Sequence, residues 1–117
     1  MHAGLGLIPG KVGALPRVGV DGVSHKIPNI GWRALREPVS GRWKNTVLGE
    51  TTSDAEMYFV HSFAADPADP ADLMATYDLG GHPICAAVQR DNISGCQFHP
   101  ERSGPAGLVI LKQFLDA

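Results

Sequence analysis

The sequence lacks the features that mark a secreted, a membrane-spanning or a nucleic-acid-binding chain. Only two of its 117 residues are cysteine, so we expect no disulfide framework. The longest apolar stretch, residues 107–111, is far shorter than the roughly 20 residues that cross a bilayer, and no signal pattern opens the chain. Ten basic residues against twelve acidic ones give a net charge of -2, without the basic excess of a nucleic-acid binder. We therefore expect a cytoplasmic protein with neither a membrane nor a nucleic acid as partner.

Glycine and proline, by contrast, are plentiful. The chain contains 14 glycines and 9 prolines, which favour short elements separated by many turns. Its length and its 44% of hydrophobic residues suit one modest domain. The composition thus predicts a loop-rich α/β domain, or a piece of one, over residues 1–117. We expect Cys85 and Cys96 to be buried thiols.

The first half of the chain contains one clear strand. Residues 57–63 are rich in aromatic and β-branched side chains and have the length of a buried strand. Residues 26–32 are apolar but interrupted by Pro28 and Gly31, which indicates an edge strand running into a loop. Residues 4–13 contain a Gly-x-Gly without the strand–turn–helix context of a phosphate loop, so we interpret them as a surface loop. We expect residues 33–53 to be mostly irregular.

The second half predicts a small meander and a helix. The X-Pro steps and carboxylates of residues 66–72 favour an exposed connecting loop. Three short runs follow, separated by turn residues, and indicate antiparallel strands; they cover residues 73–77, 84–89 and 93–98. Ser103 is the expected N-cap, and apolar residues then recur at helical spacing, at Leu108, Leu111 and Leu115. The chain should therefore close with one amphipathic helix.

The densest group of reactive side chains, residues 95–104, lies between the last strand and this helix. In an extended backbone residues i and i+2 project to the same side, so His99 and Glu101 can be neighbours. Pro100 between them restricts the backbone. A carboxylate beside an imidazole holds its tautomer and stabilises the imidazolium, which is the support that a general base needs. The pair therefore predicts a proton-transfer site.

Two other interpretations of this segment stay open. The His-Pro-Glu stretch also fits a plain strand end, with its carboxylate facing solvent or the helix dipole. A metal site would have to use scattered ligands that lack the paired spacing of zinc sites; the candidates are Cys96, His99, His61 and His82. We expect neither a metal nor any other cofactor.

Beyond these patterns, the chain closely resembles the C-terminal part of the class I glutamine amidotransferases. The resemblance rests on the string GCQFHPERSGPAGLVILKQFL and, upstream, on KIPNIGW and YFVHSF. The FHPE motif is shared by the whole class. More specific are GLGLIPGKV, KIPNIGW, FVHS, and QFHPE followed by SG, which are similar to the glutaminase subunits of imidazole glycerol phosphate synthase. The similarity covers residues 4–115.

The resemblance implies an α/β fold of the flavodoxin-like type and the hydrolysis of glutamine to glutamate and ammonia in histidine biosynthesis. A cyclase subunit is the implied partner in a heterodimer. In the family a cysteine attacks the side-chain amide of glutamine, a histidine removes its proton and a glutamate orients the histidine; His99 and Glu101 match the last two. Ser62 and Phe63 match the stretch that holds the main-chain groups of glutamine. Arg102 matches a basic residue near the interface with the cyclase.

The sequence departs from the family at the nucleophile. It contains neither the family's Gly-x-Cys-x-Gly elbow nor its oxyanion loop. We therefore expect a partial amidotransferase domain over residues 1–117, without its N-terminal part and inactive alone. Neither Cys85 nor Cys96 is expected to replace the nucleophile, because neither lies beside a base or at a helix N-terminus. A non-catalytic docking module or remnant, and a related amidotransferase serving another acceptor, remain the alternatives.

Overall fold

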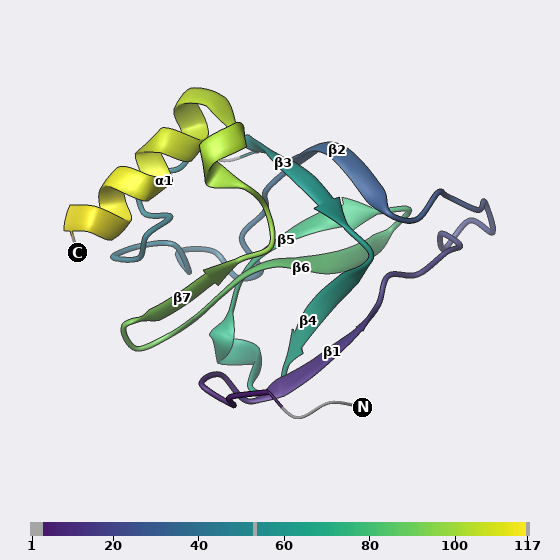
Figure 1. Cartoon of the computed structure of the whole chain (residues 1–117), viewed down its shortest axis with the longest axis horizontal. Coiled ribbons are helices and arrows are strands. Elements are labelled where there is room, and N and C mark those ends of the chain that lie inside the picture. Colours follow the sequence, from purple (N-terminus) through teal and green to yellow (C-terminus); the bar gives the residue numbers. More distant parts are fainter. Residues whose placement is uncertain (1–3, 53, 117) are drawn as a thin grey trace.

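The computed structural model describes residues 4–52 and 54–116, which form three small antiparallel sheets and one α-helix (Figure 1). The paired strands are β1 (Gly10–Ala14) with β4 (Phe63–Pro67), β2 (Asn29–Ala34) with β3 (Glu56–His61), and β5 (Leu73–Leu79), β6 (His82–Arg90) and β7 (Ile93–Cys96) as a meander. The helices are the 3-10 turns η1 (Pro70–Asp72) and η2 (Pro100–Arg102) and the α-helix α1 (Gly104–Asp116). None of the described helices is long and apolar enough to cross a membrane.

The core lies where β3 meets the meander. Successive side chains of a strand point to opposite faces, and β3 accordingly buries Met57 and Phe59 completely. The Phe59 ring centroid lies 4.5 Å from that of Tyr77 in β5 and 5.7 Å from that of Phe98, which follows β7. These contacts fix the β2–β3 ribbon to the meander, and each buried large apolar side chain contributes about 1.5–3 kcal/mol.

Several predicted elements are confirmed. The strand expected at residues 57–63 is present, but the backbone bends at Ser62, so that β3 pairs with β2 and β4 pairs with β1. The three runs of the second half form the antiparallel meander β5–β6–β7. The C-terminal helix begins at Gly104, directly after Ser103. The α/β class is therefore confirmed, with strands that pair antiparallel throughout the described sheets.

Two expectations for the first half were wrong. The segment of residues 4–13 is not wholly a surface loop, because its end forms β1; a Cβ on Gly10 would lie 2.5 Å from the Asp66 carbonyl oxygen, so glycine permits this close pairing. The edge strand does not run from residue 26 into a loop. Its loop comes first and the strand begins at Asn29, because Pro28 has no N–H to donate to a ladder.

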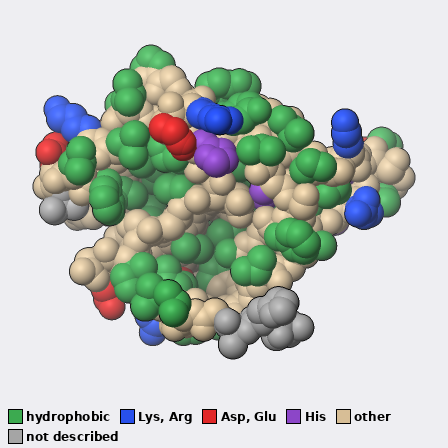
Figure 2. All heavy atoms as spheres, in the orientation of Figure 1, with side chains coloured by type: hydrophobic (Ala, Val, Ile, Leu, Met, Phe, Trp, Pro, Cys, Tyr) green, Lys and Arg blue, Asp and Glu red, His purple; other side chains and the backbone are tan. Residues whose placement is uncertain are grey.

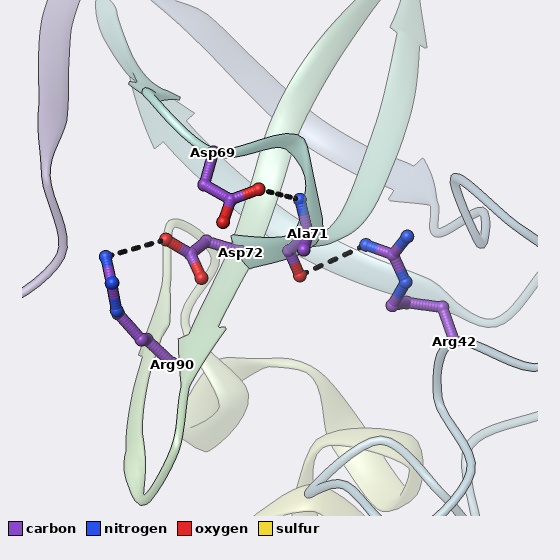
Figure 3. Close-up of polar contacts among 5 residues, drawn as sticks. All are labelled: Arg42, Asp69, Ala71, Asp72 and Arg90. Atoms are coloured by element: carbon purple, nitrogen blue, oxygen red, sulfur yellow. Dashed lines mark hydrogen bonds and ion pairs between the residues drawn. The ribbon is translucent and has the colours of Figure 1, made fainter.

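The expectation of an exposed loop at residues 66–72 was also wrong. Its first residues belong to β4, and its last form η1, where the Asp69 carboxylate accepts a hydrogen bond from the Ala71 N–H at 2.9 Å (Figure 3). Asp72 is buried and lies 3.5 Å from a guanidinium nitrogen of Arg90, while Arg42 donates to the Ala71 carbonyl at 3.2 Å (Figure 3). The segment is therefore an anchored turn.

The helix and the cysteines differ from expectation in what they expose. On α1 the buried positions are Gly107 and Ile110, whereas Leu108 and Leu115 remain 61% and 80% exposed. The spacing therefore predicted the helix, but its leucine stripe does not face this core. Cys85 is only half-buried, and Cys96 is exposed because it ends the outermost strand of the meander.

Candidate functional site

His99 and Glu101 lie together at the turn between β7 and α1. Nδ1 of His99 is 3.3 Å from Oε1 of Glu101, and the side chains are 41% and 57% exposed. A carboxylate at Nδ1 favours the tautomer that carries its proton there, which leaves Nε2 able to accept a proton. The expected proximity is therefore present, and the pair faces solvent, where a reactant can reach it.

The backbone reason for this proximity differs from the expected one. Only His99 is extended, with φ -102° and ψ 97°, and it forms the N-cap of η2. Pro100 then begins the 3-10 turn, which carries Glu101 back toward the imidazole. The pair is thus brought together by the short turn between strand and helix, and not by a continuous extended segment.

The turn is held against β3 by backbone and side-chain hydrogen bonds. The His99 N–H donates to the Tyr58 carbonyl at 3.1 Å. The Ser103 hydroxyl donates to the His99 carbonyl at 2.6 Å and accepts from the Tyr58 N–H at 3.0 Å. Below the turn, a Cβ on Gly107 would lie 2.0 Å from the Pro100 carbonyl oxygen, so only glycine lets α1 approach this closely. The pair therefore sits on a fixed backbone.

Arg102 completes this cluster on its exposed side. It is the last residue of η2 and is exposed, and its N–H donates to the His99 carbonyl at 3.0 Å. Figure 2 shows a histidine grouped with a basic and an acidic side chain on one face, with hydrophobic side chains around them. The turn that carries His99 and Glu101 therefore also carries Arg102.

Ser62 and Phe63 lie at a different place, at the junction of β3 and β4. Ser62 is four residues beyond Tyr58, which corresponds to about 13 Å along an extended strand. Its carbonyl accepts from the Leu15 N–H at 2.9 Å, and Phe63 is 58% exposed. β3 therefore connects the two predicted parts of the site, with the His99 turn beside its beginning and the Ser62–Phe63 bend at its end.

A buried polar group behind this bend was not recognised as such from the sequence. His61 is buried, with Nδ1 2.8 Å from the Phe63 carbonyl and Nε2 2.7 Å from the Tyr77 hydroxyl. Because a carbonyl only accepts, Nδ1 carries the proton, and in the neutral ring Nε2 is an acceptor that faces the Tyr77 hydroxyl. Burial lowers the pKa of His61 and raises that of Tyr77 to about 12, which keeps both groups neutral. The inward alternation of Met57, Phe59 and His61 was the available signal.

The two thiols are poor nucleophiles where they lie. Burial raises the pKa of Cys85 to about 11, and desolvation raises the pKa of Cys96 to about 11 although the residue is exposed. A thiol with such a pKa stays protonated near neutral pH, and the thiolate is the attacking form. This supports the expectation that neither replaces the family's nucleophile. Within residues 4–52 and 54–116, no three His, Cys, Asp or Glu side chains gather as metal ligands do.

Comparison with known proteins shows the family to which the chain belongs. Residues 10–117 match the model of the family described as "Glutamine amidotransferase class-I". Imidazole glycerol phosphate synthase subunit HisH 1 of Legionella pneumophila (strain Lens) is 47% identical over 115 residues, which cover 97% of this chain and 54% of the relative. The HisH subunit of Prochlorococcus marinus (strain MIT 9211) is 39% identical over 112 residues, covering 96% and 49%. The chain thus spans about half the length of the curated relatives it matches. On the family match over residues 10–117, the chain belongs to the class I glutamine amidotransferases.

Proposed function

We propose that this chain supplies the general base and its orienting carboxylate to a glutaminase that serves imidazole glycerol phosphate synthesis in histidine biosynthesis. The observation that carries the proposal is the 3.3 Å approach of His99 Nδ1 to Glu101 Oε1 in a class I amidotransferase chain. Both relatives are subunits of imidazole glycerol phosphate synthase, which supports this assignment to histidine biosynthesis. In this proposal residues 1–117 form part of a single amidotransferase domain.

The proposed reaction needs a cysteine thiol from outside these residues. Nε2 of His99 takes the thiol proton as the sulfur attacks the side-chain amide carbon of glutamine. The imidazolium returns the proton to the leaving nitrogen, so ammonia departs and a thioester remains. His99 then deprotonates a water that attacks the thioester, which releases glutamate and restores the thiol. Glu101 stays ionised and stabilises the imidazolium in both halves of the reaction.

Three further assignments belong to the same proposal. Ser62 and Phe63 hold the main-chain groups of glutamine at the β3–β4 bend. Arg102, exposed on η2, contacts a cyclase subunit, which receives the ammonia in a heterodimer in the cytoplasm. The exposure of Phe63 and Arg102 supports these roles, since each side chain is open to a partner molecule.

The base assignment is tested in a hybrid in which this chain replaces the matched segment of the Legionella pneumophila (strain Lens) relative. We expect His99→Ala to lower glutamine hydrolysis by about 10²–10⁴-fold, the usual contribution of a general base, when ammonia release is measured with the cyclase subunit present. His82→Ala in β6 is the matched control and should retain activity. Full activity of His99→Ala would show that another group is the base.

The docking interpretation shares one expectation with the glutaminase proposal and differs from it in another. Because both thiols have raised pKa values, we expect no glutamine hydrolysis by residues 1–117 alone. No glutamine hydrolysis by the unsubstituted hybrid, together with cyclase binding by the isolated chain that Arg102→Glu weakens, would favour a docking role. Glutamine hydrolysis by the isolated chain would contradict both readings.

A further inference from the structure

Ser103 connects the His99 turn to the free edge of β3. In the described sheets β3 pairs only with β2, and Tyr58 lies opposite Trp32 in that ladder. Both backbone groups of Tyr58 are used on the opposite edge, where its carbonyl accepts from the His99 N–H and its N–H donates to the Ser103 hydroxyl. The turn therefore occupies the place of a neighbouring strand, and a side-chain hydroxyl supplies the acceptor that such a strand would provide.

The Ser103 hydroxyl also binds the carbonyl group of His99. Its single proton goes to the His99 carbonyl at 2.6 Å, a short distance for an O–H···O bond. The N–H and the carbonyl of His99 are thus each tied, one directly to Tyr58 and the other through Ser103. Since Ser103 is only 2% exposed, water cannot readily take over its two hydrogen bonds.

We propose that Ser103 is a positioning residue for His99. By fixing the His99 backbone against β3, its hydroxyl keeps Nδ1 within reach of Glu101 and holds Nε2 in one direction. This inference rests on the proposed function of His99 as base. A small displacement of a base from its productive geometry lowers turnover strongly, because proximity and orientation contribute much of the rate.

The test uses the hybrid described above with Ser103→Ala and Ser103→Thr. We expect Ser103→Ala to lower kcat at least about tenfold with KM for glutamine little changed, since the effect is on orientation and not on substrate affinity. Ser103→Thr retains the hydroxyl and should recover most of kcat. Ser40→Ala, which removes a hydroxyl from an exposed loop, is the matched control.

A spectroscopic readout separates positioning from stability. The tautomer of neutral His99 can be read from long-range ¹⁵N–¹H couplings in the hybrid labelled at histidine, with the signal assigned by His99→Gln. We expect the Nδ1–H form in the wild type and in Ser103→Thr, and its loss in Ser103→Ala to the level of Glu101→Ala. A Ser103→Ala protein with a lower thermal midpoint but unchanged tautomer and kcat would overturn the proposal.

Failure of this inference and failure of the proposed function give different experimental results. If Ser103→Ala does not fold, Ser103→Cys replaces it, because the larger and weaker sulfur donor cannot reproduce the 2.6 Å bond. Equal tautomer fractions in Ser103→Cys and Ser103→Thr would then contradict the inference. If the hybrid hydrolyses glutamine without needing His99, the proposed function fails, while the tautomer still decides whether Ser103 positions the ring.

Discussion

The two faces of the β2–β3 ribbon are both apolar, but only one is covered. The inner face buries Met57 and Phe59 completely against the meander. On the outer face Ile30 and Val60 are register partners and remain 53% and 39% exposed, beside a half-exposed Trp32. A ribbon with one solvated face normally alternates apolar and polar residues. The strand pattern alone therefore does not determine which face packs, and the contacts with Tyr77 and Phe98 do.

The same contrast recurs on α1. Its inner side is short and tight, with Gly107 against the η2 turn and Ile110 in the core, while the leucine stripe lies outside. The helix thus packs through one glycine and one isoleucine, whereas Leu108 and Leu115 lie on its uncovered side. The apolar spacing of the leucines is consequently a poor guide to which side of α1 packs, and the close approach of Gly107 is a better one.

The largest effect should come from truncating the inner face. Phe59→Ala removes a fully buried ring that contacts Tyr77 and Phe98, so we expect a loss of about 3–5 kcal/mol in the free energy of unfolding. Trp32→Ala on the outer face is the matched control and should cost about 1 kcal/mol or less, because half of the ring is already in water. Urea unfolding of both variants measures the difference. Equal losses would abolish the distinction between the faces.

A somewhat smaller loss is expected from the packed side of α1. Gly107→Ala places a methyl group 2.0 Å from the Pro100 carbonyl oxygen, so the helix or the turn must move, at a cost of about 1–3 kcal/mol. Leu108→Ala, one residue further on the exposed side, should change the free energy of unfolding by at most about 0.5 kcal/mol. Thermal unfolding provides the comparison. A stabilised Gly107→Ala protein would mean that helix propensity outweighs the contact.

Local patterns predicted the elements whose partners lie nearby in sequence. β3 and the meander were evident because aromatic and β-branched runs are separated by turn residues, and their pairing within β5–β7 is consecutive. β1 was missed because its partner β4 begins about 50 residues later, at Phe63, and its glycine-rich sequence has no strand signature of its own. Pairing across such a distance is decided by tertiary contacts.

In the candidate site, too, contacts between residues close in sequence could be predicted, and contacts between distant residues could not. The two-residue spacing of His99 and Glu101 predicted their contact, although a 3-10 turn and not an extended strand produces it. The hydrogen bond between Ser103 and Tyr58 joins residues 45 positions apart, so no local pattern announces it. His61 looked like a scattered ligand until the structure showed its buried contact with Tyr77.

Acidification should weaken the inner face through His61. Burial lowers the pKa of His61 below its usual 6.5, so the unfolded chain binds the proton more readily than the folded one. The contribution of neutral His61 to the free energy of unfolding is therefore fully present above the pKa of the unfolded state. It is lost as the pH falls through about 6.5 and below. We expect this slope in urea unfolding between pH 7 and 5 to be smaller in His61→Gln. The wild type, measured over the same pH range, provides the reference slope.

The smallest effect on stability should come from making the outer face polar. Ile30→Thr replaces a half-exposed side chain with another β-branched residue, so we expect the free energy of unfolding to change by at most about 0.5 kcal/mol. The exposed apolar surface formed with Val60 and Trp32 would shrink, and binding of an apolar fluorescent dye should fall with it. Met57→Thr on the inner face should instead cause a large loss in the free energy of unfolding, because Met57 is fully buried. If Ile30→Thr were as destabilising as Met57→Thr, the outer face would have to be packed in solution.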